Sequence, residues 1–178
     1  MLYLVRHCQA TCQQPDAPLT PDGEEQAARL AVLLATRDTR RIRSSPFLRA
    51  RASIHPLAAR LGILVEIDAR LAERVLTTAP LAEWKTPLRA SFADLDACLE
   101  GGESSRVGLA RGLAALDDAL SGERPVAVVT HGNLLALLLR HLGGGDGYTV
   151  WDALTNPDVF AIDTSSTDSK PARIWPVS

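Results

Sequence analysis

The amino-acid sequence predicts an α/β fold, a three-layer sandwich in which helices flank a mainly parallel central sheet. Two apolar runs have the pattern of buried strands, Leu2–Val5 at the start of the chain and Val126–Thr130 towards its end. Around them, strand signals alternate with helix signals, which is typical of parallel α/β sheets. The chain has 178 residues and no internal repeat, so we expect one domain over residues 1–178.

In the first half of the chain, start and stop signals delimit the elements that follow the first strand. A hydroxyl residue followed by proline marks each of two expected helix starts, Thr20-Pro21 and Ser45-Pro46. The predicted elements are a helix over 20–37, a strand over 40–43, a helix over 45–62 and a strand over 63–67.

The second half begins with a segment, 74–102, that prolines interrupt and that we expect to form a helical excursion over the site. An amphipathic helix follows it, and helical spacing predicts that its inward residues are Val107, Ala110, Leu113, Ala114 and Leu120. The remaining predicted elements are a buried helix over 134–142 and two short strands over 159–162 and 172–177.

Composition argues against several classes of protein. A net charge of -2 gives no indication of a nucleic-acid partner. No apolar stretch reaches the ~20 residues that span a bilayer, and the N-terminal run is too short for a signal peptide, so we expect no membrane association and a cytoplasmic location. Cys8, Cys12 and Cys98 fit a reducing compartment better than a disulfide framework. The spacing of His7, Cys8 and Cys12 matches no common zinc pattern, so we expect no metal site.

Charged and nucleophilic side chains follow both apolar runs. The first run ends in Arg6 and His7, and the second ends in His131. Arg6 and His7 alone could simply cap a strand, but the carboxyl ends of parallel strands meet at one sheet edge, where ligands bind. Free backbone N–H groups at the start of the next helix, at Gly132 and Asn133, favour an anion.

Arg49 adds a second guanidinium, because it lies on the first turn of the helix that follows a neighbouring strand. Two arginines and a helix start supply more positive field than a carboxylate needs. A phosphoryl group, which has three equatorial oxygens, fits better. The guanidinium charges also favour a neutral imidazole, and we expect a backbone carbonyl to hold the other ring nitrogen of His7.

Six short segments carry a resemblance to a known family. They are Leu4-Val5-Arg6-His7, Leu19-Thr20-Pro21-Asp22-Gly23 with Gln26-Ala27, Ser44-Ser45-Pro46 with Arg49-Ala50, Leu71-Ala72-Glu73, Gly102-Glu103-Ser104 and Thr130-His131-Gly132-Asn133. In this order the chain resembles the histidine phosphatase superfamily, which includes cofactor-dependent phosphoglycerate mutase. The resemblance spans nearly the whole chain and implies a phosphoglycerate-mutase-like sandwich.

The resemblance implies a phosphatase without metal or cofactor that acts on a small phosphorylated metabolite. His7 would carry the phosphoryl group as phosphohistidine, and Arg6, Arg49 and His131 would hold its equatorial oxygens. Glu73 would protonate the leaving oxygen and then activate water. The substrate-binding residues would be Gln13, Gly132 and Asn133.

The sequence departs from the family pattern at three points. Cys8 stands where glycine is usual, and Gln13 stands where many members have asparagine. After Glu73, the usual glycine-tryptophan-glutamate-glycine continuation is absent. Three alternatives therefore stay open: a phosphoglycerate-type mutase, a phosphohistidine-protein phosphatase, and a catalytically inactive relative that binds phosphorylated ligands. The sequence does not indicate an oligomeric state.

Overall fold

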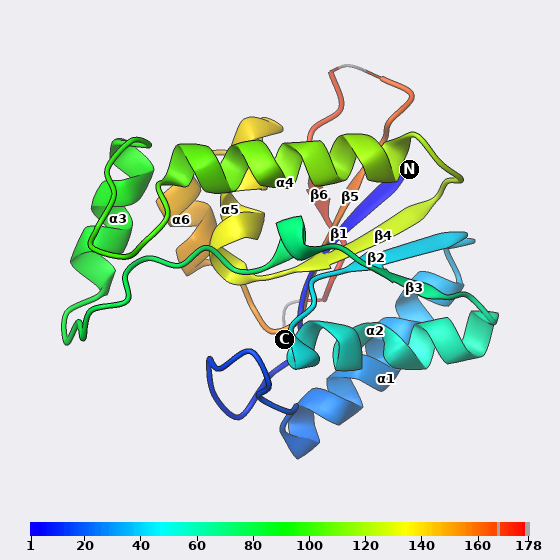
Figure 1. The fold of residues 1–178 in the computed structure, drawn as a ribbon. Coiled ribbons are helices and arrows are strands. Elements are labelled where there is room, and N and C mark those ends of the chain that lie inside the picture. Colours follow the sequence, from blue (N-terminus) through cyan, green and yellow to red (C-terminus); the bar gives the residue numbers. More distant parts are fainter. Residues whose placement is uncertain (167, 177–178) are drawn as a thin grey trace.

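A six-stranded sheet with helices on both faces forms the protein, as the computed structural model describes it for residues 1–166 and 168–176 (Figure 1). The strands are β1 (Leu2–Arg6), β2 (Arg41–Ser44), β3 (Val65–Ile67), β4 (Val126–Thr130), β5 (Asp158–Ile162) and β6 (Ala172–Arg173). The helices are α1 (Pro21–Ala35), α2 (Leu48–Leu61), α3 (Lys85–Ala93), α4 (Ser105–Leu120), α5 (Gly132–His141) and α6 (Gly147–Asp152), with a short 3-10 helix, η1 (Ala69–Leu71).

The order of the strands across the sheet is β3-β2-β4-β1-β5-β6. The first four of these strands are parallel, whereas β5 and β6 pair antiparallel at one side. The predicted three-layer α/β fold is therefore confirmed. The carboxyl ends of β1, β2 and β4 meet at one edge of the sheet, because these three strands are direct parallel neighbours.

Side-chain alternation along β1 divides the core into two apolar layers. Tyr3 and Val5 pack on the face that α1 and α2 cover, and Leu2 and Leu4 pack on the face that α4 and α5 cover (Figure 1). The helix start at Thr20 is confirmed, because its hydroxyl accepts the N–H of Gly23 at 3.0 Å. None of the helices in the described ranges is long and apolar enough to cross a membrane.

Part of the predicted inward face of α4 is wrong, although Leu113 and Leu120 do pack against the core. Val107 is 57% exposed, and Ala110 and Ala114 are also exposed. The residues of α4 that are buried are Ser105, Gly108, Gly112, Ala115, Leu116 and Ala119. Small residues form this face because α5 lies very close: a Cβ added at Gly112 would lie 2.9 Å from a methyl carbon of Leu134.

Several predicted boundaries also move. The second helix begins at Leu48 rather than at Ser45-Pro46, with Phe47 as its N-cap residue. The last strand covers only Ala172–Arg173, and Val177 lies outside the described residues. The helix α6 was not predicted, because its six residues are too few to show a helical period.

Candidate active site

The carboxyl ends of β1, β2 and β4 place three side chains next to one another. His7, Ser45 and His131 are each the first residue after one of these strands. Backbone hydrogen bonds hold the register there, from the N–H of His7 to the carbonyl of Thr130 (3.1 Å) and from the N–H of Ser45 to the carbonyl of Val129 (2.9 Å). As a result, the ring centroids of His7 and His131 lie 5.0 Å apart. Two histidines that are far apart in sequence therefore lie side by side at this edge of the sheet.

The His7 ring is held neutral, with one nitrogen free to react. Its Nδ1 lies 2.6 Å from the carbonyl oxygen of Cys8, so Nδ1 carries the proton and the lone pair is on Nε2, as the sequence predicts. Burial, together with the nearby charges of Arg49 and Arg6, lowers the pKa of His7 to about 3. The amide of Asn156 donates to the His7 carbonyl at 2.8 Å and fixes the backbone.

Arg49 reaches the histidines from the first turn of α2 and is 1% exposed. Its Nε donates to Nε2 of His7 at 3.2 Å. Its Nη1 donates to the backbone carbonyls of Gln13 (3.1 Å) and Gln14 (2.8 Å). The sequence suggests the side-chain amide of Gln13 as a donor to substrate. In the structure Gln13 is exposed, and its backbone carbonyl is the group that contacts Arg49.

Arg6 lies over the start of α5. Its Nη1 donates to the carbonyl of Leu154 at 3.1 Å, and its Nε is buried without a partner in the described chain. A Cβ added at Gly132 would lie 3.2 Å from the guanidinium carbon, so a larger residue there would require the Arg6 side chain to shift by a few tenths of an ångström. Neither Arg6 nor Arg49 forms an ion pair with a carboxylate of the described residues. Both charges are therefore available to an anion.

Glu73 caps the N-terminus of α5 with its half-buried carboxylate. It accepts the backbone N–H groups of Arg74 (2.9 Å), Asn133 (3.0 Å) and Leu134 (3.0 Å). The expectation that the Asn133 N–H is free for an anion is therefore wrong, because Glu73 already occupies it. Of the two N–H groups that the sequence predicts to be free, only the N–H of Gly132 has no hydrogen-bond partner in residues 1–166 and 168–176. The carboxylate is held by three hydrogen bonds at the start of α5, where its charge acts on Arg6 and Arg49.

Sequence reasoning missed three supporting residues: Ser45, Arg74 and Asn156. Arg74 is buried and donates from Nε to Oδ1 of Asn133 at 3.1 Å, which fixes the direction of that amide. Ser45 lies 2.7 Å from Nε2 of His131. Because Pro46 follows it, the sequence pattern indicates Ser45 as a helix cap. Arg74 and Asn156 carry no local signal, because their hydrogen-bond partners are distant in sequence.

Cys8, which replaces the usual glycine of the resembling family, points away from the histidines. Its side chain is fully buried in the apolar layer beneath α1 and α2. Its N–H donates to the hydroxyl of Ser53 at 2.7 Å. Burial raises the pKa of the Cys8 thiol to about 11. The extra side chain therefore fills space in the core.

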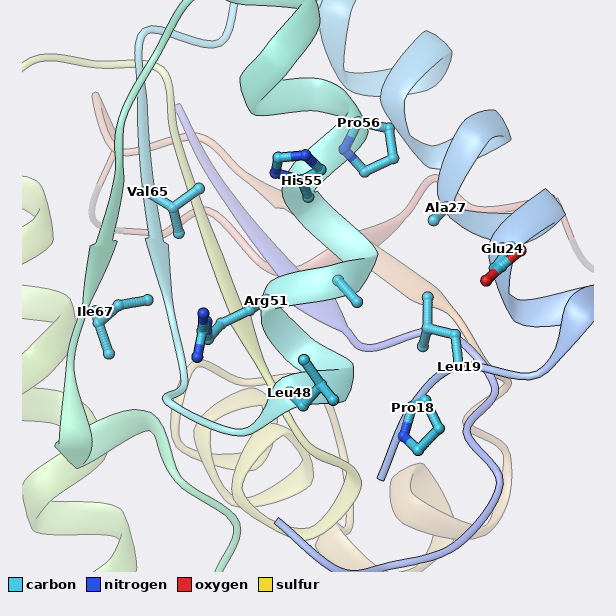
Figure 2. A pocket seen from close by; sticks show the side chains of 11 residues that line it. Pro18, Leu19, Glu24, Ala27, Leu48, Arg51, His55, Pro56, Val65 and Ile67 are labelled. Carbon is cyan, nitrogen blue, oxygen red and sulfur yellow. The ribbon is translucent and has the colours of Figure 1, made fainter. Parts of the chain in front are cut away.

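A surface hollow of about 590 Å³ lies on another face of α2 (Figure 2). It is lined by residues of α1, α2 and β3 and of the loop before α1, among them Leu19, Leu48, Arg51, His55 and Ile67. None of the expected site residues lines this hollow. The chemistry described above belongs to the strand ends and not to this hollow.

Comparison with known proteins agrees with this geometry. The sequence model of the histidine phosphatase superfamily (branch 1) matches residues 2–169. Mycobacterial glucosyl-3-phosphoglycerate phosphatase, solved with inorganic phosphate, is 26% identical, with 99% of this chain and 97% of that chain covered and a TM-score of 0.75. The protein TTHB049 from Thermus thermophilus is also 26% identical, with coverages of 98% and 99% and a TM-score of 0.71.

Other matches show the fold alone. The alpha-ribazole phosphatase from Shigella flexneri is 19% identical, with 97% of this chain and 95% of that chain covered and a TM-score of 0.73. No curated protein matches this sequence.

The placement of Cys8 predicts how the thiols react. In the folded protein at about pH 8, Ellman's reagent should label the exposed Cys12 and Cys98 quickly and Cys8 only after denaturant is added. A Cys8→Ala variant should lose the slow, denaturant-dependent thiol and keep both fast ones. Rapid labelling of Cys8 in the native state would contradict its burial.

The lowered pKa of His7 predicts a stability change with pH. Histidine in the unfolded chain takes up a proton near pH 6.5, whereas His7 in the folded chain does so only near pH 3. Between these values the unfolded state binds more protons, so the contribution of His7 is complete above pH 6.5 and is lost as the pH falls towards 3.

Urea unfolding should therefore show a larger acid loss for the wild type than for His7→Gln. From about pH 7 to about pH 4 the difference should be about 3 kcal/mol. The control His55→Gln, on the exposed face of α2, should follow the wild type. Equal acid losses in wild type and His7→Gln would show that the folded ring titrates normally.

Proposed function

The chain belongs to the histidine phosphatase superfamily, branch 1, and on this basis we propose that it is a metal-independent phosphatase that forms a phosphohistidine at His7. One observation carries the proposal: the Nε2 lone pair of His7, the His131 ring and the guanidinium groups of Arg6 and Arg49 converge at the same strand ends. The similarity to glucosyl-3-phosphoglycerate phosphatase supports a small phosphomonoester as substrate. The three free cysteines favour the cytoplasm, a reducing compartment.

In the first half-reaction, Nε2 of His7 attacks phosphorus. An N–P bond forms, the ester P–O bond breaks, and the electron pair leaves with the alcohol oxygen, to which Glu73 gives a proton. In the ligand-free protein the Nε–H of Arg49 points at the same Nε2 atom. A phosphoryl oxygen must draw that N–H away before attack, so substrate binding itself exposes the nucleophile.

In the second half-reaction, water attacks the phosphohistidine. Glu73, now ionised, takes a proton from the water, the N–P bond breaks, and its electron pair returns to Nε2 of His7. The products are inorganic phosphate and the alcohol, and the enzyme regains its starting protonation. Charge that shifts onto the equatorial oxygens is stabilised by Arg6 and Arg49, the role that divalent metal ions have in many other phosphoryl-transfer enzymes.

The positions of Cys8 and Glu73 favour an active phosphatase over an inactive relative. Cys8 does not occupy the place beside His7 and His131 where the phosphoryl group would bind, since its side chain lies in the core. Glu73 keeps a carboxylate held at the start of α5 although the sequence that follows it departs from the family pattern. This position supports Glu73 as the acid that hydrolysis of an alkyl phosphate requires.

Loss of the nucleophile should abolish turnover. Hydrolysis of p-nitrophenyl phosphate should persist in EDTA and fall at least about 10³-fold in His7→Ala. His55→Ala, which removes an exposed histidine outside the site, should leave the rate unchanged. Wild-type enzyme denatured in alkaline detergent during turnover should contain an alkali-stable, acid-labile phosphoryl group that His7→Ala lacks. Full activity of His7→Ala would refute the mechanism.

Glu73→Gln should separate substrates by leaving group. For glycerol phosphate, whose alcohol must be protonated, kcat/KM should fall by about 10²- to 10⁴-fold. For p-nitrophenyl phosphate, whose leaving group departs unprotonated, kcat/KM should change far less. The exposed Glu83 provides the matched control, Glu83→Gln, with wild-type values for both substrates. Equal losses on both esters would instead assign Glu73 a purely structural role at α5.

A further inference from the structure

Ser45, which the mechanism above does not use, lies against the second histidine. Its Oγ is 2.7 Å from Nε2 of His131, and both residues are 0% exposed. The same Oγ accepts the backbone N–H of Phe47 at 3.3 Å. The other ring nitrogen of His131, Nδ1, is buried and has no hydrogen-bond partner in the described chain.

The position of the protons in this contact follows from counting donors and acceptors. A serine hydroxyl has one proton and can accept as well. If Nε2 of His131 carried the ring proton and donated to Ser45, the hydroxyl proton would point into a fully buried region, where the described residues offer it no other acceptor. If Ser45 donates to Nε2 instead, the hydroxyl is satisfied on both sides. The ring proton is then on Nδ1.

The surroundings keep this ring uncharged. Burial holds the pKa of His131 well below its ordinary 6.5, and the nearby His7, Arg49 and Arg6 act in the same direction. The ring of Phe47 packs edge-on against it with centroids 4.8 Å apart. His131 is therefore a neutral donor with one N–H, and that N–H is buried without an acceptor among the described residues.

We propose that Ser45 is a positioning residue, whose hydroxyl fixes His131 in the Nδ1–H tautomer so that this N–H donates to a phosphoryl oxygen of the substrate. An unsatisfied buried donor costs about 1–3 kcal/mol, and a phosphoryl oxygen held beside His7 removes that cost. The identity of the acceptor rests on the proposed function. The tautomer does not, because it follows from contacts within the chain.

The test compares Ser45→Ala with Ser44→Ala. Ser44 is a neighbouring and equally buried serine, and within the described residues its hydroxyl bonds only to the carbonyl of Ser45. Nitrogen-15 NMR of the ligand-free wild type should show the proton of His131 on Nδ1. In Ser45→Ala the ring should shift towards a mixture of tautomers. The affinity for orthovanadate and kcat/KM for p-nitrophenyl phosphate should each fall about 10-fold, and Ser44→Ala should match the wild type.

The outcomes separate this inference from the proposed function. An Nε2–H tautomer in the wild type, or an unchanged tautomer and vanadate affinity in Ser45→Ala, would overturn it even if the enzyme is an active phosphatase. An Nδ1–H wild type that neither binds vanadate nor hydrolyses esters would overturn the proposed function and the acceptor assigned here. If Ser45→Ala does not fold, the wild-type tautomer, with and without vanadate, decides.

Discussion

The parallel pairing of β1 with β4 is the constraint on which the site depends. The hydrogen bond from the N–H of His7 to the carbonyl of Thr130 aligns the two strand ends, so that each histidine leaves the sheet beside the other. Strand side chains alternate between faces, and a shift of one residue would exchange the two apolar layers of the core. The packing of Leu4 on one face and Val5 on the other therefore also fixes the relative position of the two histidines.

Burial has two electrostatic effects at these strand ends. It lowers the pKa of both histidines, which keeps a lone pair available on His7 and keeps His131 a neutral donor. In the proposed function, the same low-polarity surroundings strengthen the attraction between the guanidinium groups of Arg6 and Arg49 and a dianionic phosphoryl group. Backbone carbonyls, and not carboxylates, hold these two arginines in place. Neither guanidinium forms an ion pair with a carboxylate of the described residues, although Glu73 is near enough for its charge to act on both.

The order of strands and helices and the meeting of the two histidines could be predicted from the sequence, because both follow from apolar runs and from the geometry of parallel sheets. The inward face of α4 could not, since Gly108 and Gly112 carry no hydrophobic signal and pack because they allow a close approach. The roles of Ser45 and Arg74 also escaped prediction. Each depends on one partner far along the chain, and no local pattern records such a contact.

The carboxylate of Glu73 has a mechanical consequence for α5. It is the acceptor for two N–H groups in the first turn of that helix, and an ionised carboxylate accepts more strongly than a protonated one. In the proposed cycle Glu73 gives up a proton and regains it once per turnover. While the phosphohistidine exists, Glu73 is ionised and its hydrogen bonds to the first turn of α5 are strong. Once the products have formed, Glu73 is protonated and these hydrogen bonds are weaker. Proton transfer at one side chain therefore changes how firmly the backbone of a buried helix is held.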